Sequence, residues 1–451
     1  MDRISLNGKR FQSIENFGAS GAWWAQDVGG WENVRDEIAR LLYSKTDGIG
    51  ISCYRYNMGG GSKNSGSSHF HNENRAAECF LKNDGNYDFS RDKNAVYMMK
   101  KAVEFGCDEV VLFVNSPPEI YTKNHKSCLD KPWRTNLRLS DSRKFADYCV
   151  KVAEHFVNEG IPVKFISPVN EPVWVWTERH GQEGCHYRPW GVKKVMRELS
   201  DCIENSDVLR GKVLISGAEN GDLRWFNKTY TRIMLSDEKI KKNSDGIDVH
   251  SYFLPLPFPK IFNDRVRFTR RFRKYLDKTF PNEKVRVSEW THMQGGRDCS
   301  MDSALVQARV MYEDISILNA VSWQHWIAVS DVDYCDGLIY VNPDRTYIVT
   351  KRYYAFGNFS KFVGKNDVRI GTQCDNKDLL VLAFENESKI TVIVINETND
   401  VHETDFSSFM KSGEAYVTDK DSSLERFSFE KSFKITPRSV TTLVFKKEGN
   451  E

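Results

Sequence analysis

The amino-acid sequence predicts a (β/α)8 barrel followed by a small antiparallel β-sandwich. The first observation is that short segments rich in Val, Ile and Phe alternate with amphipathic helical segments through most of the 451 residues. The second is that the helical period disappears after about residue 365, where strand-like segments follow one another with turn residues between them. The third is that the first dozen residues also alternate between apolar and polar types, which is compatible with one more strand in the sandwich.

Eight strand segments and the helices between them support the barrel. The strands are expected at residues 13–21, 50–59, 109–118, 163–172, 212–220, 246–253, 284–290 and 320–330. The helices are expected at residues 33–44, 94–106, 142–160, 191–206, 266–278, 304–319 and 351–363. Such repeats are typical of a (β/α)8 barrel. An open doubly wound sheet is the alternative, but "NMGGGSKNSG" after the second strand segment does not match the phosphate-binding turn of that fold.

The last part of the chain predicts a separate β domain. Its strands are expected at residues 379–386, 389–398, 413–420, 425–431 and 439–447. The chain therefore divides into three parts: residues 1–14, a strand that joins the sandwich; residues 15–364, the barrel; and residues 365–451, the β-sandwich.

Composition and charge exclude several classes of partner. Lys plus Arg (64) nearly balance Asp plus Glu (62), so no basic field favours nucleic acid. Nowhere do eighteen apolar residues follow one another, so no membrane span is expected. Ten cysteines without a C-x-x-C pair speak against a structural zinc site and against a disulfide framework. An aromatic content of 12%, with eleven tryptophans, suits flat neutral ligands such as sugar rings.

The first residues and the composition leave location and assembly partly open. The start "MDRISLNGKRF" has no basic segment followed by an apolar run, so the expected location is the cytoplasm. Secretion is the expectation if a native signal peptide has been removed. No sequence feature indicates an oligomeric state.

Two glutamates at predicted strand ends are the strongest candidates for chemistry. In a (β/α)8 barrel the reacting groups gather at the carboxyl ends of the strands, where the following loops form the open face. Glu171 in "PVNEP" ends the fourth strand and Glu289 in "VRVSEW" ends the seventh, so we expect both at one mouth. Two carboxyl groups across a cleft are what glycosidic cleavage requires, because one protonates the departing oxygen while the other attacks or activates water. A surface or helix-start position is the alternative for each.

The order of the motifs along the chain resembles glycoside hydrolase family 30 of clan A. The motifs are "FGASGAWW", "YRYNMGGG", "NSPP", "PVNEP", "SEW" and "SWQHW", followed near the end by "ITPRSVTTLVF". The family consists of retaining β-glycosidases, so the resemblance implies Glu171 as general acid/base and Glu289 as nucleophile. "GASGAWWAQ" near the start is most similar to the endo-β-1,6-galactanase branch, although xylan-, β-1,6-glucan- and glucosylceramide-cleaving members share the scaffold.

Polar residues at other strand ends are expected to support the two glutamates. Arg55 would keep Glu289 ionised, or else form an ion pair without a catalytic part, and Tyr252 would donate a hydrogen bond to Glu289. Asn170 would hold the sugar 2-hydroxyl, with a helix cap as its alternative. Further hydroxyl partners are expected at Asn115, Ser116 and His250, the last with a satisfied structural histidine as its alternative.

Tryptophans at strand ends are expected to stack on the apolar faces of sugar rings. The substrate-binding candidates are Trp24, Trp174, Trp290 and Trp323, and Trp23, Trp176 and Trp326 belong to the same group. Simple filling of the core is the alternative for each.

No cofactor and no metal site are predicted. "HFHN" at residues 69–72 offers two histidines without a third ligand, which favours an ordinary loop. The chain has neither a G-x-S-x-G elbow nor a Walker loop.

These observations predict a retaining endo-β-glycosidase that hydrolyses β-1,6-linked galactan or galacto-oligosaccharides. An exo-acting or oligosaccharide-specific enzyme for xylan, β-1,6-glucan or β-glucosides is the first alternative, and a transglycosidase is another. A non-catalytic carbohydrate-binding barrel is the alternative from a different class, against which the presence of both glutamates stands.

Overall fold

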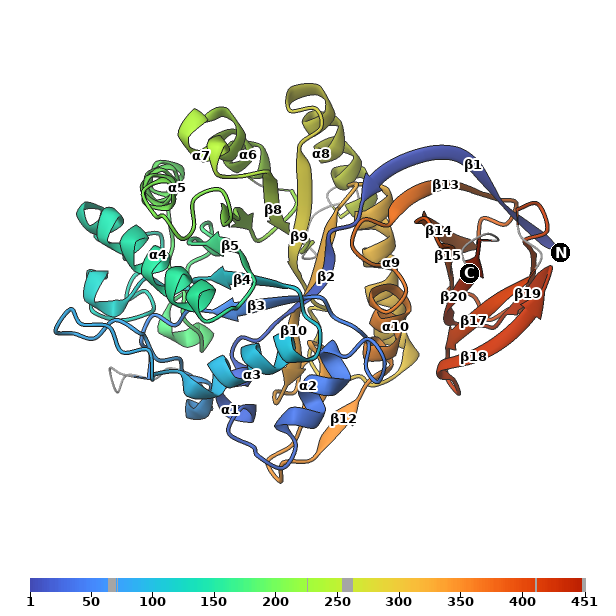
Figure 1. Ribbon diagram of the computed structural model, residues 1–451, viewed down its shortest axis with the longest axis horizontal. Helices are drawn as coiled ribbons and strands as arrows, with labels where there is room; N and C mark the ends of the chain where they lie inside the picture. Colours follow the sequence, from blue (N-terminus) through green and yellow to red (C-terminus); the bar gives the residue numbers. More distant parts are fainter. Residues whose placement is uncertain (64–69, 71, 225, 254–262, 410–411, 448–451) are drawn as a thin grey trace.

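The structure is a computed structural model that describes residues 1–63, 70, 72–224, 226–253, 263–409 and 412–447. Figure 1 shows two parts side by side. The larger part is a curved parallel sheet with helices around it, and the smaller part is a sheet that contains both the first strand of the chain and the last.

The larger part is built on a parallel sheet that curves almost onto itself. Its strands are β2 (Asn16–Ser20), β3 (Cys53–Asn57), β4 (Glu109–Phe113), β5 (Val163–Ser167), β6 (Leu214–Ile215), β7 (Ala218–Asn220), β8 (Gly246–His250), β9 (Lys284–Trp290) and β10 (Ser322–Ser330). Their order is β6-β5-β4-β3-β2-β10-β9-β8-β7. The two end strands, β6 and β7, are separated in the chain only by Ser216 and Gly217. Ser216 donates its N–H to β5, and the carbonyl of Gly217 accepts from β8. These two residues therefore span the remaining gap.

The expected alternation of parallel strands and helices is present, but the strand count differs from the prediction. The predicted strand at residues 212–220 is divided into β6 and β7, which do not pair with each other. Glu219 takes a positive φ of 45°, which a regular strand does not allow. The structure also adds a hairpin after β10 that was not predicted, formed by β11 (Gly337–Val341) and β12 (Tyr347–Val349). The pairing alone thus gives a nearly closed α/β barrel.

Helices surround this sheet. They are α1 (Trp24–Val28), α2 (Arg35–Tyr43), α3 (Lys93–Glu104), α4 (Ser142–Asn158), α5 (Pro189–Glu204), α6 (Asn227–Ser236), α7 (Glu238–Lys242), α8 (Arg265–Thr279), α9 (Met301–Ser316) and α10 (Lys351–Ser360). In α4 the apolar face consists of Phe145, Cys149, Val152 and Phe156, whose spacing of three and four residues places them on one stripe. Short 3₁₀ turns lie at Glu73–Arg75, Glu119–Tyr121, Leu139–Asp141 and Glu178–His180.

Sequence signals fix several helix starts. Pro189 is the first residue of α5, where its missing N–H costs nothing. The side chain of Asp264 accepts the N–H of Arg267 at the start of α8, and Thr350 caps α10 in the same way.

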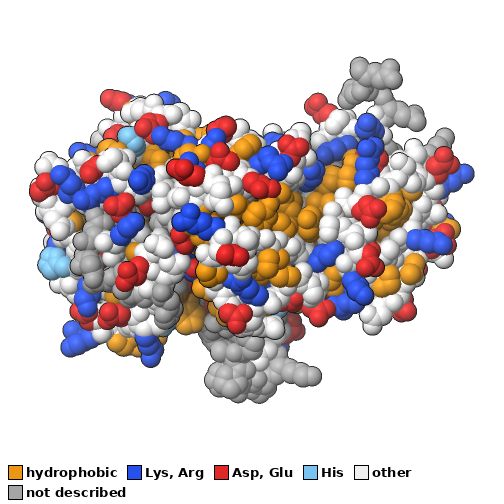
Figure 2. Space-filling view, turned by 90° about the horizontal axis from the view of Figure 1, so that it is seen from below, with side chains coloured by type: hydrophobic (Ala, Val, Ile, Leu, Met, Phe, Trp, Pro, Cys, Tyr) orange, Lys and Arg blue, Asp and Glu red, His pale blue; other side chains and the backbone are white. Residues whose placement is uncertain are grey.

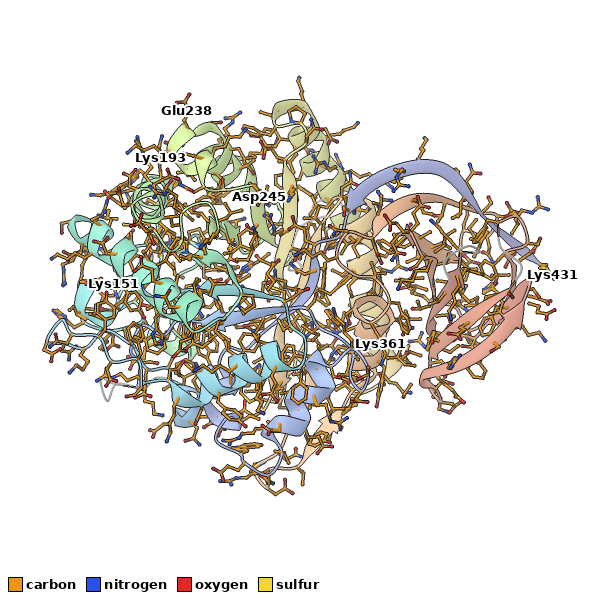
Figure 3. The ribbon with its side chains drawn as sticks, in the orientation of Figure 1. Lys151, Lys193, Glu238, Asp245, Lys361 and Lys431 are labelled. Atoms are coloured by element: carbon orange, nitrogen blue, oxygen red, sulfur yellow. The ribbon has the colours of Figure 1, made fainter. Side chains whose placement is uncertain are left out.

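Charged residues close the amino-terminal end of the parallel sheet. Arg286 in β9 donates to Glu15 at 2.7 Å and also pairs with Asp245, which Figure 3 labels beside β8 and β9. Lys284 bonds to the same two carboxylates. This end is therefore occupied by ion pairs, so the carboxyl ends of the strands remain for a binding site.

The smaller part is one continuous nine-stranded sheet. Its strands are β1 (Asp2–Ser13), β13 (Val368–Cys374), β14 (Leu379–Glu385), β15 (Lys389–Asn396), β16 (His402–Asp405), β17 (Ser412–Thr418), β18 (Ser423–Glu430), β19 (Ser432–Ile435) and β20 (Ser439–Lys446). Their order is β18-β17-β20-β15-β14-β13-β1-β16-β19. β1 pairs antiparallel with β13 and parallel with β16, so the first strand of the chain lies in the C-terminal sheet.

A sandwich of two separate sheets is not confirmed by this pairing, although the β-rich character of the region is. The end strands β18 and β19 are neighbours in the chain, with Lys431 between them, so the sheet bends back on itself; Figure 3 labels Lys431 at the outer end of the molecule. The strands β13, β16 and β19 were not predicted. Ile4 of β1 packs with Val392, Leu443 and Phe445 in the core of this part.

Helices α9 and α10 lie between the two parts (Figure 1). The side chain of Asn358 in α10 donates to the carbonyl of Tyr416 at 2.9 Å and to Thr442 at 3.0 Å. On the barrel side, Lys361 donates to the carbonyls of Thr46 and Gly48 at 2.9 Å each; Figure 3 labels Lys361 at this boundary. Hydrogen bonds thus attach α10 to both parts.

The surface carries both charges in mixture. On the face in Figure 2, Lys and Arg side chains alternate with Asp and Glu side chains, in keeping with the near balance of the sequence. All ten cysteines are free thiols, and only Cys299 among them is exposed. No described helix is both long and apolar enough to cross a membrane.

Candidate active site

A cavity of about 350 Å³ opens at the carboxyl ends of the parallel strands, and both predicted glutamates line it. Glu171 lies in the loop after β5, and Glu289 lies near the end of β9. This volume is within the range of small-molecule sites. The two residues, far apart in the sequence, are therefore brought to one cavity, as their positions at strand ends predicted.

Local backbone geometry fixes the position of Glu171. Its φ is +42°, in the left-handed region, and its N–H donates to the carbonyl of Glu219 at 3.0 Å. Gly221 packs directly against it, because a Cβ at that position would lie 2.7 Å from Glu171 Oε1 and 2.4 Å from Trp174 Nε1. Only glycine leaves room for the carboxyl group and this indole to meet there.

Two donors hold Glu289. Arg55 Nη1 lies 2.7 Å from Oε2, and the Tyr252 hydroxyl donates to Oε1 at 3.0 Å. The Arg55 side chain is fully buried and also donates to Glu219 at 2.8 Å and to Asn170 at 3.1 Å. Charge-assisted bonds from both donors favour the ionised form of Glu289.

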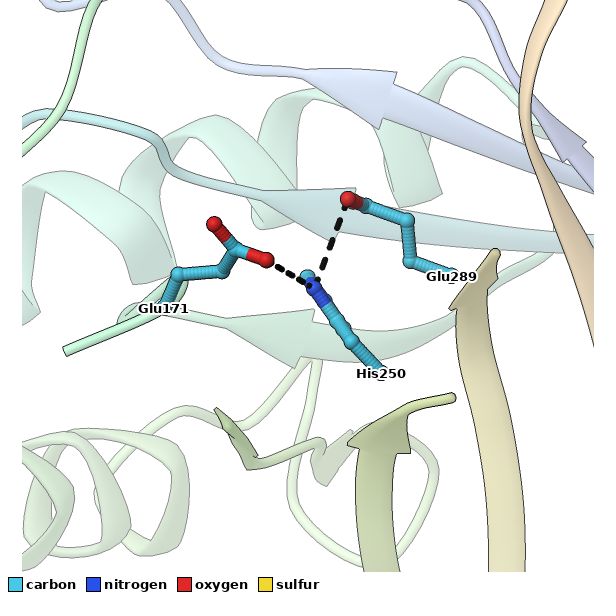
Figure 4. A group of neighbouring side chains, drawn as sticks. All are labelled: Glu171, His250 and Glu289. Carbon is cyan, nitrogen blue, oxygen red and sulfur yellow. Dashed lines mark hydrogen bonds and ion pairs between the residues drawn. The ribbon is translucent and has the colours of Figure 1, made fainter. Parts of the chain in front are cut away.

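His250 connects the two glutamates, as Figure 4 shows. Its Nδ1 lies 2.9 Å from Glu171 Oε1 and 3.4 Å from Glu289 Oε1. Burial and the charge of Arg55 lower the pKa of His250 well below its usual value, so the ring is neutral. Nε2 has no hydrogen-bond partner among the described residues. The proton therefore belongs on Nδ1, which donates it to a carboxylate.

The pKa values of the two glutamates are separated by their surroundings. Burial raises the pKa of Glu171 well above its ordinary value, and the charge of Glu289 raises it further. Burial also raises the pKa of Glu289, to about 7, while Arg55 and Tyr252 act in the opposite direction. When one proton is present, it resides on Glu171. One site thus offers an acid and a carboxylate at the same pH.

Glu171, His250 and Glu289 each place one ligand-type atom within 4.8 Å of the other two. Such a set can in principle bind a cation, but its surroundings do not fit one. Coordination through Nδ1 would move the histidine proton to Nε2, which has no acceptor in the described part of the chain. Glu289 is already paired with Arg55 at 2.7 Å. His69 and His71 of the "HFHN" segment lie outside the described residues.

Residues 2–340 match the sequence pattern of O-glycosyl hydrolase family 30. The chain belongs to this family. It is therefore a glycoside hydrolase, and its substrate is a carbohydrate. No curated protein sequence matches this family 30 enzyme.

Solved structures similar to the family 30 enzyme span almost the whole chain. A conserved exported protein from Bacteroides fragilis shares 24% identity with a TM-score of 0.88, covering 98% of this chain and 100% of that one. The catalytic domain of a family 30 xylanase C from Talaromyces cellulolyticus shares 17% identity with a TM-score of 0.75, covering 98% and 99%. An endo-β-1,6-glucanase shares 16% identity with a TM-score of 0.72, covering 98% and 94%. At these identities the likeness concerns the fold.

The structure gathers the predicted polar residues of the family 30 enzyme around the glutamates, but not all at the cavity surface. Asn170 and Tyr252 line the cavity. Asn115 is buried below it, where its Oδ1 accepts from Asn170 at 3.0 Å while its Nδ2 donates to Asn57 at 2.9 Å. His250 is fully buried and does not line the cavity. Both residues hold other side chains in place, so their predicted role as hydroxyl partners is wrong for this structure.

Three of the predicted substrate-binding tryptophans lie in the core. Trp24 is 2% exposed and donates its indole N–H to the carbonyl of Ser20. Trp323 is 0% exposed and donates to Asp314 at 2.9 Å. Trp290 is buried against Trp323, with 5.8 Å between ring centroids, and is not among the cavity residues. These side chains face away from the cavity and fill space between strands and helices, so they do not stack on sugar here.

Other aromatic residues form the cavity wall instead. Trp174, predicted for this role, lines the cavity and is 37% exposed. Trp176 and Trp326, which belonged only to the wider aromatic group of the sequence, line it as well, together with Tyr334. Tyr334 follows β10 in a loop without a motif, so no sequence signal identified it.

Two acidic residues of the site were missed from the sequence. Glu219 is fully buried, bonds to Arg55 and also accepts from the Ser167 hydroxyl at 2.7 Å. Its signal was available, since "SGAEN" ends a predicted strand with a carboxylate just as "PVNEP" does. Asp336 lines the cavity from the segment between β10 and β11, where no predicted strand ended.

Proposed function

We propose that this family 30 enzyme is a retaining endo-β-glycosidase that hydrolyses β-1,6-linked galactan or galacto-oligosaccharides. The observation that carries the retaining mechanism is the closeness of Glu171 and Glu289, whose nearest ligand-type oxygens lie within 4.8 Å of each other. In retaining enzymes the two carboxyl groups are about 5–5.5 Å apart, whereas inverting enzymes leave about 6.5–9.5 Å for a water molecule. This spacing suits direct attack by Glu289.

The first step forms a covalent glycosyl-enzyme. An oxygen of Glu289 bonds to the anomeric carbon while the bond between that carbon and the departing glycosidic oxygen breaks. Glu171 transfers its proton to that oxygen, so the departing sugar leaves as a neutral alcohol. Because Glu289 becomes an ester and loses its charge, the pKa of Glu171 falls once the intermediate has formed.

The second step releases the sugar. The ionised Glu171 takes a proton from water, and the water oxygen displaces Glu289 from the anomeric carbon. Two inversions at that carbon restore its original configuration. Arg55 and Tyr252 stabilise Glu289 as leaving carboxylate, and Asn170 lies at the cavity surface where it can bond to the sugar 2-hydroxyl.

The aromatic wall supports a neutral glycan as substrate. Trp174, Trp176 and Trp326 offer faces on which pyranose rings can stack. Trp174 is partly exposed at the cavity, and Trp133, in the loop after β4, is 64% exposed, with its ring centroid 5.9 Å from that of His186 in the loop after β5. Exposed aromatic rings beyond the cavity favour a chain long enough to extend past the cleavage point, as endo action requires.

The choice of galactan comes from the resemblance of "GASGAWWAQ" to the galactanase branch. Trp23 and Trp24 of this motif are buried, so it links the chain to the branch without contacting sugar. Among the similar structures, two are described as xylanases and one as an endo-β-1,6-glucanase. Exo action and xylan or β-1,6-glucan substrates are therefore the alternatives that the experiment must distinguish.

The same proposal extends to domain division and location. Counting β6 and β7 as halves of one strand gives a (β/α)8 barrel at residues 15–364, with residues 1–14 and 365–451 as a β-sandwich. A polymeric substrate would be met outside the cytoplasm, and the similar Bacteroides fragilis protein is described as exported. We therefore favour export over the cytoplasmic alternative.

The test is product analysis on β-1,6-galacto-, β-1,6-gluco- and β-1,4-xylo-oligosaccharide ladders, with wild type and Glu289→Gln in parallel. Internal cleavage of the galacto ladder by the wild type, absent in the variant, is the expected result. Cleavage of another ladder would contradict the proposed galactan substrate but remain consistent with the proposed mechanism. Release of single sugars from one end would favour exo action, and formation of longer oligomers would favour transglycosylation.

A further inference from the structure

Asp336 forms part of the wall of the cavity that contains the two glutamates. It lies just before β11 and is 7% exposed, yet it lines the same cavity as Glu171 and Glu289. Its backbone carbonyl accepts from His325 Nε2 at 2.7 Å and from the Thr291 hydroxyl at 3.2 Å. Because β10 and the end of β9 both hold this backbone, Asp336 keeps a fixed position relative to Glu289.

The carboxyl group of Asp336 is only partly satisfied by the protein. The Ser330 side chain bonds to it, but Oδ1, which is itself closed to solvent, has no hydrogen-bond partner among the described residues. The two nearby guanidinium groups are engaged elsewhere. Arg75 pairs with Asp331 at 2.8 Å, and Arg352 donates to the carbonyl of Gly337 at 2.7 Å. A buried carboxylate without a full set of donors costs free energy, which a bound donor would recover.

The chemistry of the wall restricts what that donor can be. Burial raises the pKa of Asp336 to about 6, so the group is mainly an ionised acceptor at neutral pH. A sugar hydroxyl can donate to it. A sugar carboxylate cannot, and would also meet the negative charge. In the described part of the chain the cavity is lined by Glu171, Glu289 and Asp336 and by no Lys or Arg, and His180 is the basic side chain among its lining residues.

We propose that Asp336 is a specificity-determining residue that accepts a hydrogen bond from a hydroxyl group of a neutral sugar and excludes glycans that carry a carboxylate at that position. The assignment rests on the proposed function, since it places the sugar in the same cavity. It adds the class of substrate: neutral β-linked oligosaccharides are accepted, and their uronic acid counterparts are rejected.

The experiment measures binding separately from cleavage. Isothermal titration on the Glu289→Gln background gives Kd for β-1,6-galacto-, β-1,6-gluco- and β-1,4-xylotetraose, and for β-1,6-galactotetraose oxidised to the carboxylate at C6 of its terminal non-reducing ring. Asp336→Ala removes the acceptor, and Asp336→Asn keeps one oxygen acceptor but removes the charge. Asp344→Asn, in the exposed turn between β11 and β12, is the matched control. Thermal melting checks that each variant is folded.

We expect Asp336→Ala to raise the Kd of the best neutral ligand by about tenfold or more, because a hydrogen bond to a charged group is lost. Asp336→Asn should lose less affinity for the neutral ligand than Asp336→Ala does. It should also narrow the ratio between the Kd values of the oxidised and the neutral ligands by about tenfold. The control Asp344→Asn should change neither the Kd values nor their ratio. Unchanged affinities in folded Asp336→Ala, an unchanged ratio in Asp336→Asn, or no binding of any neutral ligand would overturn the proposal. Binding that depends on Asp336 in a protein whose wild type cleaves none of the ladders would refute the proposed substrates and leave this assignment standing.

Discussion

Arg55 Nη1 lies 2.7 Å from Oε2 of Glu289, and neither side chain is more than 5% exposed. This buried pair links the fold to the proposed mechanism, in which a strand-end arginine favours the ionised form of the attacking carboxylate. Arg55 also donates to Glu219 at 2.8 Å, so its own charge is shared between two carboxylates. The arginine is a positioning residue that acts through Glu289.

Arg55→Lys should lower kcat by about 10²–10³ with a smaller change in KM, because an ammonium cannot reach both carboxylates as a planar guanidinium does. Loss of the pair raises the pKa of Glu289, so the acid limb of the pH profile should move to higher pH. The measurement is kcat and kcat/KM from pH 4 to 9, with melting temperature as the control for folding. An unchanged acid limb would show that Arg55 does not set the ionisation of Glu289.

The pH dependence of kcat/KM should be bell-shaped. The proposed mechanism requires ionised Glu289, whose pKa is about 7, and protonated Glu171, whose pKa is raised well above its usual value by burial and by Glu289. The rate should therefore fall below about pH 7 and again at higher pH. In Glu171→Gln, tested with a 2,4-dinitrophenyl glycoside that needs no acid, the basic limb should disappear while the acid limb stays. Persistence of the basic limb would assign it to another group.

Removal of the titratable carboxyl group at Glu171 should change how stability varies with pH. The folded protein binds a proton on Glu171 at pH values where the unfolded chain, with a pKa near 4.5, has lost it. The free energy of unfolding of the wild type should therefore decrease as the pH rises from 4.5 toward the folded pKa, by up to about 1.4 kcal/mol per pH unit. In Glu171→Gln this decrease should be smaller. Denaturant unfolding at pH 5, 6, 7 and 8 measures it, and parallel curves for both proteins would contradict the prediction.

His250 should act by holding the carboxyl groups. His250→Leu removes the Nδ1–H donor and should lower kcat by about 10–10² with little change in KM. Because a donor to a carboxylate favours its ionised form, the loss should also raise the pKa of Glu171 and move the basic limb upward. His250→Asn, which offers an amide N–H near the same place, should recover part of the rate. His402→Asn in β16 is the control, and an effect of His250→Leu on KM alone would show a contact with substrate instead.

The two kinds of tryptophan should behave differently. Trp174→Ala removes a stacking surface at the cavity and should raise KM about tenfold, as the loss of about 1.4 kcal/mol implies, with the melting temperature unchanged. Trp323→Ala removes a fully buried side chain and should destabilise the protein by about 3–5 kcal/mol. Kinetics and thermal unfolding of both variants test this contrast. A raised KM in folded Trp323→Phe with an intact Trp174 would place Trp323 at the substrate after all.

The sequence by itself determined the sites of Glu171 and Glu289, the alternation of strands and helices and the β-rich C-terminal region. These features depend on the local period of apolar residues and on the fact that the loops after parallel strands all lie at the same end of the sheet. Arg55, Asn170 and Tyr252 followed from the same reasoning, because each stands at a strand end close to a motif.

Only the tertiary structure decided which strand-end side chains face the cavity. Trp323 and Trp326 lie three residues apart in β10, a spacing that places them on opposite faces of the strand; Trp323 is in the core and Trp326 lines the cavity. The spacing separates the two faces but does not say which face meets the cavity, because register shifts in the pairing of β10 change the direction of neighbouring side chains. Asp336 belongs to a segment without strand or helix pattern, and its place at the site arises from contacts with His325 in β10 and with Thr291, which directly follows β9. Chemistry carried by strand ends can thus be read from local pattern, whereas chemistry carried by loops depends on packing between distant segments.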